Sequence, residues 1–316
     1  MEKVVNIKVI GVGGAGNSVV DRMIASGIKD VTYFDINTSG NAIRASQAEE
    51  KLQIGENLTN GLGTGSDVET GQRAAQAARS RIEDSLKGCE MVFIAAGMGG
   101  GCGTGAAPVV AEIAKELGIL TVAVVTMPFS FEGRKRMQVA ESGVELLRKA
   151  ADAIIVIPNN NLKFATDSKL TFINAFAIAD SILVQTVGSI IDLVQKTALI
   201  NSDFADITTV MQNSGITHVG LCRAAGPNRA QTVFESIRKS KLLDTTIENA
   251  KAVLLCITAS SRVELEEIET LSSAVRTDVH PEANIIFGLR TDDMMGDDLQ
   301  AMIIATTFEE STKRIQ

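Results

Sequence analysis

The sequence predicts an α/β protein with a doubly wound, mostly parallel sheet domain, a long central helix and a second, smaller α+β domain. Three observations support this fold class. Short apolar runs alternate with helical patterns as far as Pro158, a long apolar stripe of helical period follows, and a mixed pattern of strands and helices completes the sequence. With 316 residues, of which 45% are hydrophobic, the chain is long enough to form two packed domains.

The first domain is expected over residues 1–168. Its short runs are apolar at nearly every position, which is typical of parallel strands that helices cover on both sides. Strands are expected at residues 6–12, 31–37, 90–97, 119–128 and 152–159, with helices at 17–27 and 107–118. This alternation indicates a doubly wound α/β domain.

A single long helix is expected within residues 169–200, where it would connect the two domains. Apolar side chains recur there at steps of three and four, which marks one face of a helix. About 25 residues at a rise of 1.5 Å span on the order of 37 Å. The stripe consists of Phe172, Phe176, Ala179, Leu183, Val187, Ile190 and Val194.

The C-terminal domain is expected over residues 201–316. Strands are expected at residues 216–225, 250–259, 283–289 and 300–308, and helices at 228–240 and 263–276. Two strands in succession near the end indicate an α+β sheet with helices on one face.

Composition disfavours several classes of function. The formal net charge of −8 argues against direct binding to nucleic acid or an anionic membrane, because neutralising phosphates requires clustered Lys and Arg. The four cysteines are scattered and the two histidines lie far apart, so neither a zinc site nor a disulfide framework is expected. The sequence has no signal-peptide pattern and no apolar run near the roughly 18 residues of a membrane span, so we expect a cytoplasmic protein.

The first glycine-rich turn, Gly11 to Gly16, matches G-x-G-x-x-G between a predicted strand and a predicted helix. Asp35 lies 19 residues after Gly16 (35 minus 16) and is expected to end the next strand. In the dinucleotide fingerprint an acidic residue at this place binds the ribose. One interpretation is therefore an NAD-dependent oxidoreductase.

Two further glycine-rich turns point to a larger phosphate site. They are "GLGTGS" at Gly61–Ser66 and "GMGGGCGTG" at Gly97–Gly105. Backbone amides from several loops can surround a whole triphosphate, whereas the sequence has no G-x-x-x-x-G-K-[ST] motif. The alternative is that the glycines form only tight turns and helix caps.

The segment "GGGCGTG" at Gly99–Gly105 resembles the G-G-G-T-G-(S/T)-G signature of the tubulin/FtsZ family. The segments "IKVIGVGGAGNSVVDRM", "PFSFEGRKRM", "VIPNNNL" and "NSDFAD" follow the order of that family's motifs. The similarity extends from about Ile7 to Phe308, nearly the whole chain. The resemblance implies a nucleotide-binding domain at 1–168 and an activation domain at 201–316, in a tubulin/FtsZ-like fold.

The resemblance implies a site for GTP or GDP with Mg²⁺. Phosphates and water would hold the Mg²⁺, so no protein metal ligand is implied. A carboxylate can accept hydrogen bonds from guanine N1 and N2, and an aromatic ring can stack on the base. The implied contacts are Gly13, Gly14, Gly16, Asn17 and Ser18 in the first loop, Thr64 and Gly65 near the γ-phosphate, Gly100, Gly101, Cys102, Gly103, Thr104 and Gly105 in the signature loop, Glu132 and Arg136 for ribose and phosphate, and Asn159, Phe176 and Asp180 for guanine.

The implied catalytic residues are Asn201, Asp203 and Asp206 in "NSDFAD". From spacing alone, the simpler interpretation is that Asn201 or Asp203 caps a helix while the helix dipole favours Asp206. In the family these acids polarise the attacking water from the neighbouring subunit. The resemblance therefore implies an assembly-activated GTPase that polymerises head-to-tail, with its own copies as partners.

The implied role is the cytokinetic division ring, in the cytoplasm at midcell, without direct contact to nucleic acid or membrane. Nothing follows "EESTKRIQ", so the usual peptide for membrane-tethering division proteins is missing from this sequence. We expect either truncation or a different filament role, such as segregation of plasmid or phage DNA. The oxidoreductase and a scaffold that binds nucleotide without hydrolysis remain alternatives.

The sequence departs from the family pattern at several positions. Cys102 replaces the usual Thr, which exchanges a hydroxyl for a weakly hydrogen-bonding thiol. Helix N-termini lower the pKa of thiols, so Cys102 is either an oxidisable thiol or an inert buried one. Asn160 stands where Asp is common, Pro227 stands where Glu is common, and "FAIAD" lacks the usual Arg-Glu pair after Phe176. These changes concern turnover and subunit contacts more than nucleotide identity.

Overall fold

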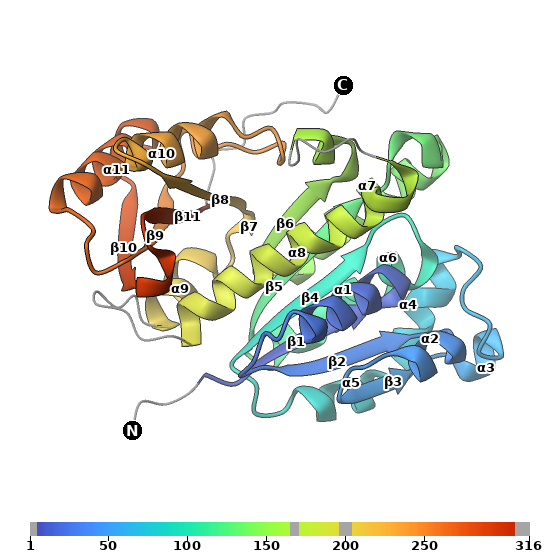
Figure 1. Cartoon of the computed structure of the whole chain (residues 1–316). Coiled ribbons are helices and arrows are strands. Elements are labelled where there is room, and N and C mark those ends of the chain that lie inside the picture. The colour runs from blue at the N-terminus through green and yellow to red at the C-terminus, as the bar shows by residue number, and fades with distance from the viewer. Residues whose placement is uncertain (1–4, 165–170, 196–203, 307–316) are drawn as a thin grey trace. The chain divides into compact units, whose positions relative to one another are not determined.

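The computed structural model describes residues 5–164, 171–195 and 204–306 (Figure 1). The chain divides into two compact units, Met1–Gln195 and Lys196–Gln316. The first unit contains a parallel sheet between two layers of helices, and the second contains a mixed sheet with helices. The predicted fold class is thereby confirmed.

Parallel strands form the sheet of the first unit, in the order β3-β2-β1-β4-β5-β6. The central strands β1 and β4 bury nearly every side chain, because helices cover both faces. β3 is a short edge strand of four residues. The bounds are Ile7–Val12 for β1, Thr32–Asn37 for β2, Glu50–Gln53 for β3, Met91–Gly97 for β4, Leu120–Met127 for β5 and Ala153–Pro158 for β6.

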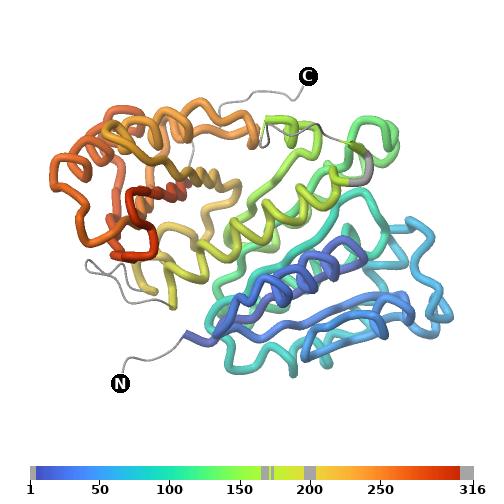
Figure 2. Tube along the Cα trace, in the orientation of Figure 1, coloured from blue at the N-terminus to red at the C-terminus, as the bar shows by residue number. Residues whose placement is uncertain are grey.

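Helices form a layer on each face of this sheet. α1 (Gly13–Ala25) and α8 (Phe172–Gln195) lie side by side on one face (Figure 2). α6 (Gly101–Glu116) shares the core of the opposite face with α4 (Val68–Ala77), α5 (Arg79–Leu86) and α7 (Arg134–Ala150). The shorter helices are α2 (Gly40–Ala45), α3 (Glu56–Thr59), η1 (Ser130–Glu132) and η2 (Asn159–Phe164).

Two glycines allow α4 and α6 to pack with their backbones in contact. A Cβ built on Gly105 would lie 2.7 Å from the backbone nitrogen of Gln72, and one on Gly71 would lie 3.0 Å from the carbonyl carbon of Gly101. Real Cβ atoms do not approach backbone this closely, so a side chain at either position would push the helices apart.

α8 is a core helix of the first unit. Its buried stripe includes Ala179, Leu183, Val187 and Ile190, as the spacing predicts, and the helix packs against α1 and β5. By length and composition alone, Asn174–Gln195 would also suffice to cross a membrane, so the expectation that no stretch reaches that length is wrong. Asp180 and Asp192 interrupt the apolar residues of this segment, and its buried stripe explains part of the high mean hydropathy.

The sheet of the second unit has the order β10-β9-β11-β8. β10 is parallel to β9, whereas β11 is antiparallel to both β9 and β8. α10 and α11 share one apolar core with these strands, and α9 contacts β9 and β11. The bounds are Phe204–Met211 for α9, Gly215–Ile216 for β7, His218–Ala225 for β8, Arg229–Lys239 for α10, Ala252–Ala259 for β9, Leu265–Asp278 for α11, Asn284–Thr291 for β10, Asp293–Met295 for η3 and Asp298–Thr306 for β11.

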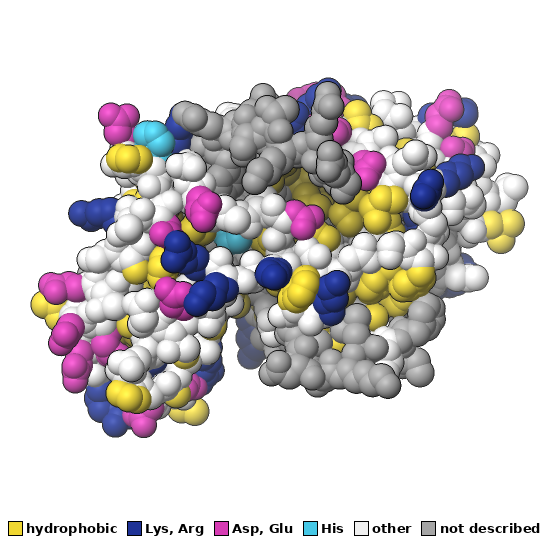
Figure 3. All heavy atoms as spheres, turned by 90° about the horizontal axis from the view of Figure 1, so that it is seen from above, with side chains coloured by type: hydrophobic (Ala, Val, Ile, Leu, Met, Phe, Trp, Pro, Cys, Tyr) yellow, Lys and Arg dark blue, Asp and Glu magenta, His cyan; other side chains and the backbone are white. Residues whose placement is uncertain are grey.

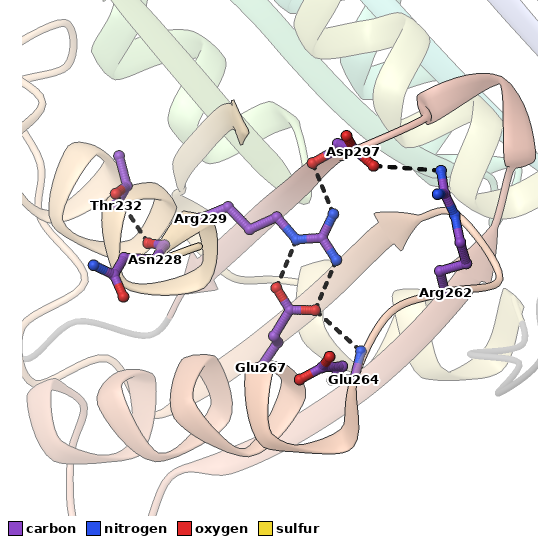
Figure 4. Close-up of polar contacts among 7 residues, drawn as sticks. All are labelled: Asn228, Arg229, Thr232, Arg262, Glu264, Glu267 and Asp297. Carbon is purple, nitrogen blue, oxygen red and sulfur yellow. Dashed lines mark hydrogen bonds and ion pairs between the residues drawn. The ribbon is translucent and has the colours of Figure 1, made fainter. Parts of the chain in front are cut away.

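A polar cluster ties the N-termini of α10 and α11 to the start of β11 (Figure 4). The guanidinium of Arg229 makes two hydrogen bonds to the carboxylate of Glu267, of 2.6 and 2.7 Å, and a third of 2.7 Å to the carbonyl oxygen of Asp297. Glu267 also accepts from the backbone nitrogen of Glu264 at 3.0 Å. Both side chains of the Arg229–Glu267 pair are mostly buried, so the pair is a structural clamp.

Acidic and basic side chains are interspersed on the face that Figure 3 shows. Several helices carry ion pairs one turn apart, such as Asp84 with Lys87 and Glu235 with Lys239. Exposed pairs of this kind contribute little to stability. Their effect is to keep the helix surfaces solvated.

Candidate functional site

A cavity of about 480 Å³ lies at the carboxyl ends of the strands of the first unit. In α/β sheets of this kind, ligands bind at that edge. The loops after β1, β2, β4, β5 and β6 all contribute to the wall, together with the loop before α4. Its lining residues from the predicted site are Gly13, Gly14, Thr64, Gly100, Gly101, Cys102, Gly103, Glu132, Arg136, Asn159, Phe176 and Asp180.

Two helices begin at this cavity without a side-chain cap. α1 follows Val12 and α6 follows Gly100, and neither residue has a side chain that accepts a hydrogen bond from the first turn. A Cβ on Gly14 or Gly100 would meet nothing within 4 Å, so the backbone there faces open space. Unpaired amides and the positive ends of two helix dipoles make this wall a site for anions such as phosphate.

Other glycines of the predicted site serve packing. A Cβ on Gly16 would lie against the carbonyl oxygen of Ala95 on β4, and one on Gly103 would lie 2.7 Å from the carbonyl oxygen of Gly97. Gly16 and Gly105 do not line the cavity. These residues let α1 and α6 approach the sheet and α4, and thereby place the exposed amides. Gly65 also lies outside the lining and has a φ of +58°, which a glycine adopts without strain.

A chain of amide side chains holds the first loop from behind. The Asn17 side chain donates to the carbonyl oxygen of Gly11 at 2.9 Å and accepts from the Asn37 side chain at 2.6 Å. Asn37 in turn accepts from the backbone nitrogen of Ser39 at 2.9 Å. Asn17 and Ser18 do not line the cavity, and the Ser18 hydroxyl donates to the carbonyl oxygen of Gly14 at 3.1 Å. The network therefore fixes the loops after β1 and β2 relative to each other.

The first turn of α6 contains two polar side chains with different environments. Thr104 is buried, and its hydroxyl accepts from the backbone nitrogen of Gly99 at 2.8 Å. Cys102 lines the cavity, and burial raises the pKa of its thiol, although the neighbouring Thr38 offsets part of this rise. The raised pKa keeps the thiol protonated, which favours the inert alternative for Cys102.

One end of the cavity has the size and chemistry for a base. Asn159 is 4% exposed, and its side-chain oxygen has no hydrogen-bond partner among the described residues. The ring of Phe176 is partly exposed and contacts Phe129 edge-on, with 5.3 Å between ring centroids. Asp180 forms an ion pair with Arg22 at 2.9 Å, and burial raises the pKa of Asp180 while Arg22 lowers it. This end thus presents an amide acceptor, an aromatic ring and a carboxylate.

Glu132 and Arg136 line the neighbouring wall. Glu132 accepts from the backbone nitrogen of Phe129 at 2.8 Å and pairs with Arg136 at 3.1 Å. The pair places a cation at the cavity while fixing the turn that precedes α7.

Asp35 does not reach the cavity. It is fully buried, and β2 ends at Asn37, so the expectation that Asp35 ends this strand is wrong. Burial raises the pKa of Asp35 to about 6. An acid that binds a ribose must face the ligand at the strand end. Asn37 occupies that place instead, which argues against the dinucleotide interpretation.

The predicted catalytic residues are only partly within the described chain. Asn201 and Asp203 lie outside the described residues. Asp206 is half-buried in the first turn of α9, in the second unit.

The residues at the end of β2 and directly after it were not predicted as part of the site. Asn37, Thr38 and Ser39 all line the cavity. The hydroxyl of Thr38 is buried and has no hydrogen-bond partner among the described residues. The available signal was the run of three polar residues that ends the buried strand and follows it, because the ends of neighbouring parallel strands share one edge of the sheet.

This arrangement defines a class. A parallel α/β sheet that offers backbone amides from two helices to one cavity, with polar and aromatic groups for a base beside them, is a nucleotide-binding fold.

Comparison with known proteins identifies the family. Residues 6–167 match the model of the tubulin/FtsZ family GTPase domain, and residues 215–309 match that of the FtsZ family C-terminal domain. An empty FtsZ dimer from M. jannaschii superposes with a TM-score of 0.89 and 36% identity, over 97% of this chain and 89% of that one. The chain therefore belongs to the FtsZ family, and its first unit contains the family's GTPase domain.

More distant structures share the fold. CetZ2 from Haloferax volcanii, solved as a GTPγS-bound protofilament, matches with a TM-score of 0.82 and 19% identity over 97% of this chain and 94% of that one. CetZ1 from the same organism, solved as a GDP-bound monomer, matches with a TM-score of 0.83 and 19% identity over 96% of this chain and 95% of that one.

Proposed function

We propose that this protein binds GTP and GDP in the cavity of the first unit and hydrolyses GTP when copies assemble head-to-tail into the filament of a division ring. The observation that carries the proposal is the cavity itself, where two uncapped helix N-termini lie beside Asn159, Phe176 and Asp180. The FtsZ dimer similar to this chain supports self-association. Assembly occurs in the cytoplasm, at the division site.

The phosphates bind to the amides that begin α1 and α6. Gly14 and Gly100 leave this backbone open, and Arg136 supplies a positive charge at the neighbouring wall. Charge-assisted hydrogen bonds from several amides replace the lysine of a P-loop.

The base end favours guanine over adenine. Guanine presents N–H donors at N1 and N2, and Asp180 and Asn159 are acceptors at this end. Adenine lacks those two donors, so it would leave the Asp180 carboxylate without a ligand partner. Burial raises the pKa of Asp180, and the ion pair with Arg22 offsets part of this rise and so favours the carboxylate form that accepts hydrogen bonds.

Mg²⁺ fits this site as a companion of the phosphates. The two cavity carboxylates, Glu132 and Asp180, are already paired with Arg136 and Arg22, so no carboxylate is left to form a dedicated metal cage. Hydroxyl groups of Thr38, Ser39 and Thr64 line the cavity and can contact the waters of a phosphate-bound Mg²⁺. When bound, the ion neutralises phosphate charge.

Hydrolysis requires acidic residues that we assign to the neighbouring copy. The motif resemblance places Asn201, Asp203 and Asp206 in this role, in which the carboxylates orient and polarise the attacking water. A head-to-tail contact that does not close forms a filament, so activity and polymerisation become coupled.

The test is to measure GTP hydrolysis and light scattering together against protein concentration. Both should rise above one threshold for the wild type, and Asp203→Ala should scatter without turnover. Glu141→Ala, which removes an exposed acid of α7, is the matched control and should behave as the wild type. Full activity per subunit at high dilution, or normal turnover in Asp203→Ala, would contradict the shared site.

A further inference from the structure

A buried carboxylate lies directly behind the phosphate loop. Asp35 on β2 is paired in register with Gly11 on β1, and a Cβ on Gly11 would collide with its Oδ1 atom. The same Cβ would lie 2.7 Å from the carbonyl oxygen of Gly16, in the first turn of α1. The Asp35 carboxylate therefore lies between β1 and the start of α1, and it is not part of the cavity lining.

This carboxylate is poorly compensated. It is fully buried, and neither oxygen has a hydrogen-bond partner within residues 5–164, 171–195 and 204–306. The charged groups that act on it are Asp21 of α1, which opposes ionisation, and Lys51 of β3, which favours it, and the polar side chains nearby are Ser46 and Asn17. Lys51 donates to the carbonyl oxygen of Ser46 at 2.6 Å, so its hydrogen-bonding capacity is partly used elsewhere.

An ionised Asp35 carboxylate at this place weakens the attraction of the site for phosphate. The amides that begin α1 attract phosphate, and a negative charge directly behind them reduces that attraction. The phosphate in turn disfavours ionisation of the carboxylate, because the two anions share one weakly screened region. Proton binding by Asp35 and nucleotide binding therefore favour each other.

We infer that Asp35 sets the nucleotide affinity of this site through its charge, and that nucleotide binding is coupled to its protonation. Asp35 touches no part of the ligand cavity, so it acts through the field at the phosphate loop. The inference rests on the proposed function, since the ligand must carry phosphates. Burial raises the pKa of Asp35 to about 6, so the coupling falls just below neutral pH.

The test compares GDP dissociation constants of the wild type and Asp35→Asn between pH 5 and pH 8. Two unit charges about 10 Å apart at an effective dielectric near 20 alter affinity by roughly tenfold, so Asp35→Asn should bind GDP about tenfold more tightly at pH 7.5. The ratio between the two proteins should fall towards one near pH 5, where wild-type Asp35 is protonated. Because the ratio is used, titration of the GDP phosphate cancels.

Asp21→Asn is the matched control. It removes one negative charge from α1, whose first amides face the cavity, and its hydrogen bond from the backbone nitrogen of Gln47, 2.8 Å long, can be kept by an asparagine oxygen. Because Asp21 also acts on Asp35 in the wild type, the control is made in the Asp35→Asn protein, where adding Asp21→Asn should change the GDP affinity by the same factor at pH 5.5 and pH 7.5. Calorimetry in two buffers of different ionisation enthalpy supplies a second measurement, in which the wild type should take up more protons on binding GDP at pH 6.5 than Asp35→Asn.

The outcomes separate the two proposals. Equal GDP affinities of the wild type and Asp35→Asn at every pH, with equal proton uptake, would overturn the role of Asp35 and leave the proposed function standing. Failure of both proteins to bind GDP at any pH would contradict the proposed function and this inference together.

Discussion

Two glycine-to-alanine substitutions separate packing from ligand binding at the cavity. Gly16→Ala places a methyl group against the carbonyl oxygen of Ala95 and 3.0 Å from the carbonyl carbon of Gly11, so α1 must move away from the sheet. Overpacking against backbone costs about 3 kcal/mol of unfolding free energy. Gly100→Ala meets nothing within 4 Å, and its φ of −93° is allowed for any L-residue, so its stability should change by less than about 1 kcal/mol.

Gly100→Ala, which should leave stability nearly unchanged, should weaken GDP binding directly. The methyl group of Gly100→Ala projects into open space at the start of α6 and displaces a phosphate oxygen from the amides. Loss of one hydrogen bond to a charged group amounts to about 2 kcal/mol, or roughly thirtyfold in the GDP dissociation constant.

Urea unfolding and GDP titration on the same samples measure both quantities. Gly14→Ala, at the start of α1, has the same open surroundings as Gly100→Ala, so it should likewise weaken GDP binding with little loss of stability. If Gly100→Ala binds GDP as tightly as the wild type, the start of α6 is not the phosphate site. If Gly16→Ala is as stable as the wild type, the packing argument is wrong.

Three further predictions concern single side chains. Asp180→Asn should weaken GDP binding by about tenfold or more and reduce the preference for GDP over xanthosine diphosphate, measured by competition, because the amide donates where the carboxylate accepts. Burial lowers the pKa of His218 to about 4, so the unfolded chain binds the proton more strongly than the folded one. The free energy of unfolding should therefore be at its full value above pH 6.5 and fall by about 3 kcal/mol towards pH 4. Denaturant titrations of His218→Gln should not show this loss. Arg229→Met should lower the urea midpoint of the second unit by the equivalent of about 3 kcal/mol because it leaves Glu267 buried without its partner, and the double variant with Glu267→Leu should recover most of it.

The strands and the long helix could be predicted because their signals are local. The apolar runs of β1, β4 and β5 are continuous, and the stripe of α8 has a clear helical period. α4 escaped prediction because its inward-facing residues, such as Gly71 and Ala74, are too small to form a visible apolar stripe, and α5 because it buries only Ile82 and Leu86. Their helical packing depends on the partner α6, which a local pattern does not contain.

The cavity was predicted in outline and not in detail. Glycine-rich loops after strands indicate a phosphate site, but the sequence does not distinguish Gly100, which faces open space, from Gly105, which packs against α4. Asp35 shows the same limit, because its spacing fits a ribose ligand while the pleat of β2 turns it into the interior. Side chains alternate between the two faces along a strand, so the register of β2 decides whether Asp35 faces the interior or the ligand.

The glycine contact between α4 and α6 has a mechanical consequence for the cavity. The loop with Thr64 leads into α4, and the loop with Gly100 leads into α6, so the two helices carry adjoining parts of the cavity wall. Because Gly71 and Gly105 let these helices pack at backbone contact, the Thr64 loop and the start of α6 keep a fixed relative position. This position is thus set by two glycines that do not themselves line the cavity, where a single added methyl group would act as a wedge.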